Sequence, residues 1–169
     1  TYYWRVVPTS AVGGDATGCT EFSFTTELDP FAPYCSNLVF TSSVEPITLV
    51  MFGGINNSSF ADIDGSQGHE NFTSISGDVT TENSYTMTLK GNTGGSFTNN
   101  FRVFIDWNQD GDFADAGETF NAGTISGSTG LDAVSAVSTI TVPASAVAGT
   151  TRMRIKKLYG TTSIDNPCI

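Results

Sequence analysis

An acidic stretch follows an apolar run at FIDWNQDGDFADAGE, residues 104–118, which holds five acidic residues and no basic one. Within it, Asp106, Asn108 and Asp110 are spaced two apart, and Gly111 follows directly. Calcium loops of the EF-hand type use this spacing, because alternate side-chain oxygens turn toward one ion and glycine permits the sharp turn. The spacing therefore predicts a calcium site.

The remaining ligands would come from the second half of the stretch. We expect a backbone carbonyl of Asp112 or Phe113 to bind next, and a carboxylate of Asp115 or Glu118 to complete the shell. An all-oxygen donor set favours calcium over zinc or copper. The twelfth position from Asp106 is a glycine and no helix pattern flanks the stretch, so this is a calcium loop on a β scaffold and not an EF-hand. The predicted ligands are Asp106, Asn108, Asp110, Asp112, Asp115 and Glu118.

A turn with solvated acids is the alternative, since Asn, Asp and Gly favour turns without any ion. Against it, the five acidic side chains repel one another unless a cation compensates their charge. Asp62 and Asp64, together with Glu70, are a weaker candidate for a second ion site.

The sequence contains no complete set of catalytic residues. His69 is the single histidine and lies in the polar stretch GSQGHENF, and no nucleophile motif such as GxSxG is present. A Ser-His-Asp or Cys-His arrangement needs both partners. We therefore expect no enzymatic activity.

The charge balance limits the partners. The net charge is −10 and the sequence pI is near 4.2, which excludes nucleic acid, because phosphate binding needs Lys and Arg. No apolar run reaches the roughly 18 residues of a membrane span, so membrane insertion is not expected. The basic residues Arg152, Arg154, Lys156 and Lys157 alternate in part with Met153 and Ile155, which places the Arg side chains on a solvated strand face.

The elements that must position the acidic stretch are short strands separated by Gly, Asn, Ser and Asp, which indicate an all-β fold. In the strand that precedes the stretch, Phe101, Val103, Ile105 and Trp107 share one face, and Asp106 lies on the other with Asn108. We predict an antiparallel, jelly-roll-like β-sandwich, with a helical turn or wide loop at 143–149. The predicted strands are 36–42, 46–55, 70–75, 84–91, 100–108, 118–125, 137–143 and 151–159.

The first part of the chain has a different pattern. Residues 1–10 and 19–27 alternate like strands, and the turn-rich AVGGDATG separates them, so they predict a hairpin that is marginal by itself. The pattern resembles the last two strands of a fibronectin type III domain, and we interpret 1–28 as its C-terminal fragment. Two prolines make 29–33 a stiff linker. We expect the chain to be an internal piece of a longer protein, with 34–169 as its main domain.

The main domain carries a second resemblance. The motif FIDWNQDGDF followed by GE, the opening YCS, ENFT, TMTLKGNTGG, VPASAVAGTTRMRI and the closing NPC are similar to the GEVED domain. This family occurs in secreted surface proteins of Bacteroidetes, attached to peptidases, other enzymes or adhesin arrays, often ahead of a sorting signal for type IX secretion. Its Gly-Glu-Val-Glu-Asp motif would follow the last cysteine. The resemblance therefore implies that 34–169 is a sandwich lacking its C-terminal end.

Cys35 and Cys168 lie near the two ends of this domain. Their placement and the resemblance together predict a disulfide, which would close a long loop and imply an oxidising, extracellular setting. Cys19 is left over, and its partner is open.

The expected function is that of a non-enzymatic, calcium-stabilised β-sandwich module of a secreted or cell-surface bacterial protein, used for structural spacing or adhesion. The expected partners are neighbouring domains of the same polypeptide, with a surface glycan or a protein as further candidates. The alternative is a carbohydrate-binding accessory domain of a secreted hydrolase. Trp107 and Tyr159 are its candidate sugar-stacking residues, and a planar row of exposed aromatic rings would favour it.

Overall fold

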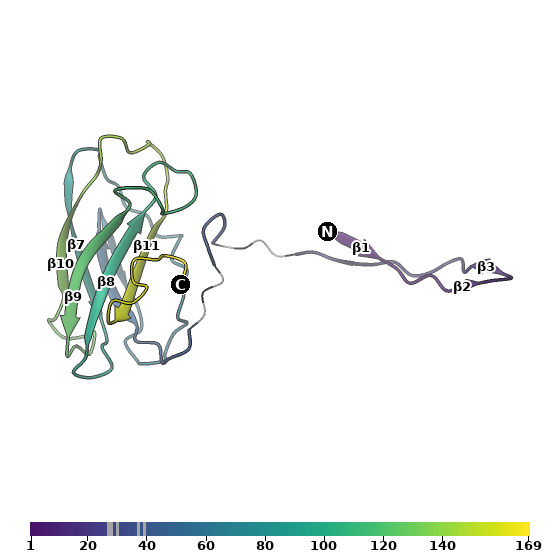
Figure 1. Ribbon diagram of the computed structural model, residues 1–169, viewed down its shortest axis with the longest axis horizontal. Helices are drawn as coiled ribbons and strands as arrows, with labels where there is room; N and C mark the ends of the chain where they lie inside the picture. Colours follow the sequence, from purple (N-terminus) through teal and green to yellow (C-terminus); the bar gives the residue numbers. More distant parts are fainter. Residues whose placement is uncertain (27–28, 30, 37, 39) are drawn as a thin grey trace. The chain divides into compact units, whose positions relative to one another are not determined.

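The computed structural model describes residues 1–26, 29, 31–36, 38 and 40–169. The chain divides into two compact units, Thr1–Pro30 and Phe31–Ile169. The described residues form eleven strands and no helix (Figure 1), and accordingly none of them belongs to a helix that could span a membrane. The predicted all-β class is confirmed. Three residues of the expected fragment and linker, at 27, 28 and 30, lie outside the described residues.

The first unit is a long hairpin of short strands. β1 (Tyr2–Trp4) pairs antiparallel with β4 (Phe22–Phe24), and β2 (Thr9–Ser10) pairs with β3 (Gly14–Asp15) nearer the turn. The strand pair expected here is therefore present. Its relation to a fibronectin type III domain stays a prediction.

Aromatic pairs across the two strands hold the β1–β4 part together. The rings of Tyr2 and Phe24 stack with centroids 5.4 Å apart, and those of Trp4 and Phe22 stack at 5.1 Å. All four side chains are at least half exposed. The hairpin is thus stabilised by cross-strand pairs and has no buried core.

The second unit is an antiparallel sandwich of two sheets (Figure 1). The four-stranded sheet has the order β10-β7-β5-β6, and the three-stranded sheet has the order β11-β8-β9. The strands are β5 (Ile47–Phe52), β6 (Ile55–Ser58), β7 (Ser84–Gly91), β8 (Thr98–Ile105), β9 (Thr119–Ser126), β10 (Ala136–Thr141) and β11 (Met153–Tyr159). This confirms the predicted sandwich.

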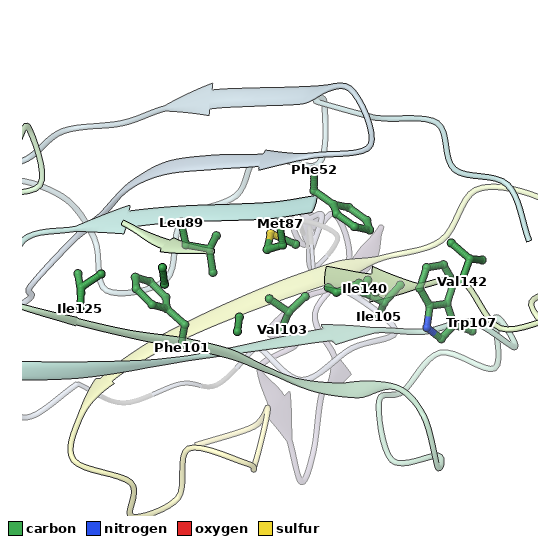
Figure 2. Packing of buried hydrophobic residues seen from close by; sticks show 12 residues of the cluster. Phe52, Met87, Leu89, Phe101, Val103, Ile105, Trp107, Ile125, Ile140 and Val142 are labelled. Atoms are coloured by element: carbon green, nitrogen blue, oxygen red, sulfur yellow. The ribbon is translucent and has the colours of Figure 1, made fainter. Parts of the chain in front are cut away.

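The core lies between the two sheets, where Met87 and Leu89 of β7 meet Phe101 and Val103 of β8 (Figure 2). The four residues predicted to share the core face of the β8 strand, from Phe101 to Trp107, are all buried. Phe104 points to the opposite face of β8 and is buried as well. β8 pairs with β11 on one edge and with β9 on the other, and the buried side chains show that both of its faces are covered as well. This strand leads into the acidic stretch.

Several predicted strands differ from the structure. The stretch 46–55 is not one strand but two, β5 and β6, joined at Gly53 and Gly54, whose φ angles of 54° and 93° suit a tight hairpin turn. Residues 70–75 form no strand, because Asn71 accepts a hydrogen bond from the amide of Thr73 and favours a turn. The described residues of 36–42 form no strand, and residues 37 and 39 lie outside the description. Residues 143–149 are a loop.

The predicted disulfide between Cys35 and Cys168 is confirmed, with Cα atoms 5.6 Å apart. It joins the segment that opens the second unit to the segment that closes it. Cys19 lies in the first unit and is not in a disulfide.

The prediction that the Arg154 side chain lies on a solvated face of β11 is wrong. Its guanidinium donates to the carbonyls of Cys35 (2.7 Å) and Pro167 (2.8 Å), and burial lowers its pKa. The joined end segments therefore cover this face of the sheet. The side chain of Lys157, on the opposite face of β11, is only 2% exposed, so it too is not solvated.

Candidate metal site

The acidic stretch is the connection between two neighbouring strands. β8 ends at Ile105 and β9 begins at Thr119, and the two strands pair antiparallel. The base of the connection is closed by a hydrogen bond from the amide of Ile105 to the carbonyl of Glu118 (2.9 Å). We call residues 106–118 the acidic loop. Its ends are fixed by the sheet, so its acidic side chains are held near one another.

Asp106 organises the start of the acidic loop from a fully buried position. Its Oδ1 accepts a hydrogen bond from the amide of Gln109 (2.6 Å), and its Oδ2 accepts from the amide of Gly111 (3.0 Å) and from the hydroxyl of Tyr34 (2.6 Å). Both carboxylate oxygens are thus used within the protein. Burial, with the hydrogen bond and charge of Asp106 adding to it, raises the pKa of Tyr34 to about 12.

Glu118 closes the acidic loop and is only 2% exposed. Its Oε1 accepts a hydrogen bond from the amide of Trp107 (2.8 Å), whereas its Oε2 has no hydrogen-bond partner among the described residues. Burial raises the pKa of Glu118, and the charge of Asp106 contributes in the same direction. Buried carboxylate oxygens without a partner are rare, so this oxygen is a candidate to bind water or an ion.

Three exposed carboxylates converge at the tip of the acidic loop. Asp110, Asp112 and Asp115 each offer one oxygen, and these oxygens lie within 4.8 Å of one another. The amide nitrogen of Asn108 donates to Oδ2 of Asp110 (2.9 Å) and to Oδ2 of Asp115 (2.7 Å). We call Asp110, Asp112 and Asp115 the carboxylate trio.

Turns within the acidic loop set the positions of the trio. Oδ1 of Asp110 accepts from the amide of Asp112 (3.1 Å), and Oδ1 of Asp112 accepts from the amide of Ala114 (2.7 Å). The hydrogen bond from Asn108, supported by that from the amide of Asp112, lowers the pKa of Asp110. Backbone amides therefore hold the carboxylates of Asp110 and Asp112 in place.

An aromatic anchor fixes the loop to the sandwich. Phe113, between two of the acids, is only 4% exposed, and its ring stacks on Tyr34 with centroids 4.7 Å apart. The guanidinium of Arg154 lies over the same Phe113 ring, 5.5 Å from its centroid. The sequence analysis named Phe113 only for its backbone carbonyl, as a possible calcium ligand, and gave Tyr34 no role at the site. The apolar residue inside an acidic stretch was the signal that could have identified the anchor.

The six predicted ligands thus fall into two groups. Asp106 and Glu118 are buried at the base of the acidic loop, and Asn108 and the carboxylate trio lie exposed at its tip. The tip offers only carboxylate and amide oxygens, which is the donor set that Ca²⁺ takes. These residues therefore fit a hard divalent cation.

The other candidates do not form comparable sites. Asp64 accepts a hydrogen bond from the amide of Val44 (2.6 Å), and in the described part of the chain Asp62, Asp64 and Glu70 are not gathered as metal ligands. His69 stacks on Phe31, with ring centroids 3.9 Å apart. Trp107 is buried in the core, so its ring faces are not available to a sugar.

The fold and the loop define a small all-β sandwich module with an acidic connection and no assembled catalytic set among the described residues. Residues 100–169 match the family model of the GEVED domain. The matched stretch begins in β8 and includes the acidic loop, β9, β10, β11 and the closing segment with Cys168. No curated protein and no solved structure matches the chain. The family match supports a non-catalytic accessory module.

Proposed function

We propose that residues 31–169 are a calcium-stabilised, non-catalytic β-sandwich module of a secreted or cell-surface bacterial protein, and that the module serves in structural spacing or adhesion. The observation that carries the proposal is the convergence of the carboxylate trio within 4.8 Å. Three like charges at this separation repel one another, and a divalent cation removes that repulsion.

The ion would bind the carboxylates of Asp110, Asp112 and Asp115. Asn108 already directs its amide group at two of these carboxylates. Turning that amide about its terminal bond replaces the nitrogen with an oxygen, which is the atom that calcium binds. Asp106 and Glu118 then have a supporting role, because their hydrogen bonds to backbone amides shape the loop.

The acidic loop links two strands of one sheet, so an ion there would stabilise the folded sandwich. An ion that binds the folded loop and not the unfolded chain raises the free energy of unfolding by mass action. The disulfide supports a secreted or surface location, because such bonds persist in oxidising compartments. Trp107, one of the two aromatic residues named for a carbohydrate-binding role, is buried and gives that alternative no support.

Calorimetric titration with calcium tests the proposal. We expect one site with a dissociation constant of about 10⁻⁴ to 10⁻³ M, as in other extracellular modules. The double variant Asp110→Asn with Asp112→Asn should show no binding heat. Asp78→Asn removes one exposed acid elsewhere in the same unit and should bind like the wild type. Equal binding by the wild type and the double variant would contradict the assigned ligands.

A further inference from the structure

A second group of polar side chains, two of them buried and one partly buried, lies at one end of the sandwich, away from the acidic loop. In the pairing of β11 with β8, Lys157 lies opposite Phe101, and Tyr159 lies opposite Asn99. Residues directly opposite share a face, as do residues two apart on one strand. Lys157 and Asn99 therefore both point to the core face of this sheet, on adjacent strands. Glu45 approaches them from the segment just before β5, in the other sheet.

The three side chains meet at one carboxylate oxygen. The Nζ atom of Lys157 is 3.5 Å from Oε2 of Glu45, and the amide nitrogen of Asn99 donates a hydrogen bond to the same Oε2. The Lys157 side chain is 2% exposed and Asn99 is 1% exposed. The Glu45 side chain is 24% exposed. A buried amine and a buried primary amide are therefore held together at a partly buried carboxyl group.

An ordinary ion pair does not account for all of this arrangement. Burying the lysine, with a glutamate that is itself only partly exposed, costs more free energy than their attraction returns unless further hydrogen bonds satisfy the buried groups. Lys157 gains one such bond, to the carbonyl of Asn92 (2.8 Å). The Oδ1 atom of Asn99, however, has no partner among the residues that the structure describes. Burial also lowers the pKa of Lys157 to about 8, so more of its amine is neutral and nucleophilic at neutral pH.

We propose that this group forms an intramolecular isopeptide cross-link, in which Nζ of Lys157 is bonded to Cγ of Asn99 and Glu45 is the proton-transfer residue. The inference goes beyond the proposed calcium function and does not depend on it. It assigns a covalent modification to the opposite end of β8 from the acidic loop.

The reaction balances without any oxidant or co-reactant. Lys157 first transfers a proton to Glu45, which gives a neutral amine and a carboxylic acid. With the Asn99 amide turned over, the acid donates a hydrogen bond to Oδ1 and polarises the carbonyl. The amine then attacks Cγ, and Glu45 carries one proton from Nζ to Nδ2. The bond between Cγ and Nδ2 breaks, ammonia leaves, and an amide joins the two side chains.

The cross-link would add a covalent bond between β8 and β11, which pair there through backbone hydrogen bonds and, at the end of β11, through the hydrogen bond from the Asn100 side-chain amide to the carbonyl of Gly160 (2.8 Å). The enclosed chain contains the acidic loop, β9 and β10. A closed covalent loop restricts the unfolded chain in the same manner as a disulfide. This property suits a module that bears load between neighbouring domains.

Mass spectrometry of the purified, reduced full chain tests the inference. We expect the intact mass to be lower than the sequence mass by one ammonia molecule. Trypsin should then release peptides 91–102 and 157–169 joined through Asn99 and Lys157, as the sequence places the cleavage sites. Separate linear peptides with an unmodified Lys157 amine and an intact Asn99 amide would overturn the inference. A lost ammonia located in an Asn99 succinimide, with Lys157 free, would overturn it equally.

Variants assign the roles. Glu45→Gln keeps the shape of the side chain but cannot carry the proton, so it should restore the full sequence mass. Asn99→Ala removes the acceptor and should do the same, which provides a second readout if one variant folds poorly. Lys156→Arg changes the neighbouring cation on the other face of β11 and should leave the cross-link unchanged. A cross-link that persists in Glu45→Gln would contradict the role given to Glu45.

Discussion

The hydroxyl of Tyr34 donates a hydrogen bond of 2.6 Å to Oδ2 of Asp106, across a sequence separation of 72 residues. This contact ties the opening segment of the second unit to the first residue of the acidic loop. The same Asp106 carboxylate accepts hydrogen bonds from the backbone amides of Gln109 and Gly111. The shape of the loop therefore depends on a tyrosine that lies far away in the sequence.

Replacing this tyrosine should weaken the fold. Tyr34→Phe keeps the ring that stacks on Phe113 but removes the donor to a buried carboxylate, and hydrogen bonds to charged groups contribute about 1.5 to 3 kcal/mol. We expect the free energy of unfolding in urea to fall by roughly that amount. Tyr159→Phe, at an exposed tyrosine in the same unit, should leave it unchanged. Equal stability of Tyr34→Phe and the wild type would show that the contact is not stabilising.

The same pair gives a pH dependence with a defined sign. The pKa of Tyr34 is raised from 10.0 to about 12, so the folded state favours the neutral phenol. Its contribution to stability is fully present below pH 10 and is lost as the pH rises through 12. The difference in unfolding free energy between the wild type and Tyr34→Phe should therefore stay constant from pH 7 to 10 and shrink above it. A difference that grows above pH 10 would contradict this assignment.

Loss of the disulfide should destabilise the second unit strongly. Cys35 and Cys168 are 133 residues apart, and the chain-entropy model gives about 4 to 5 kcal/mol for a loop of this order. We expect Cys35→Ser with Cys168→Ser to lower the melting temperature, and reduction of the wild type to have the same effect. Cys19→Ser is the matched control and should melt like the wild type. Unchanged melting of the double variant would contradict a structural role for the bond.

The first unit should not fold alone. Its four stacked rings are at least half exposed, so little apolar surface is removed from water to offset the ordering of the backbone. A peptide of residues 1–26 should give a coil-like circular dichroism spectrum at all temperatures. A cooperative thermal transition in that peptide would contradict this prediction.

Local sequence patterns predicted the strands that alternate regularly. β7, β8 and β11 follow a period of two, and the core face of the β8 strand was predicted residue by residue. β6 was missed because INNS is polar and the chain turns back at Gly53 and Gly54. The strand predicted at 70–75 was wrong, because a turn at Asn71 overrides the short apolar pattern.

The features of the candidate metal site that the sequence did not predict depend on contacts between residues far apart in the chain. The acidic loop was predicted from its spacing, but the division of its acids into a buried base and an exposed tip depends on Tyr34 and Phe113. Arg154 was expected in solvent, because nothing in the local pattern shows that the two end segments cover its strand face. The alternation did contain a signal for Lys157, which shares a strand face with Ile155 and Met153 and not with Arg154.

The response of the melting temperature to calcium tests the central claim most directly. At a hundredfold excess over its dissociation constant, a bound ion adds about 2.7 kcal/mol to the free energy of unfolding, which corresponds to roughly 5 to 10 °C for a domain of this size. We predict that the wild type melts lower in chelator than in calcium by this amount, and that added calcium restores the higher value. Asp110→Ala should melt equally in both, because one member of the carboxylate trio is gone. Identical melting of the wild type in chelator and in calcium would contradict the account and leave the acidic loop as a solvated turn.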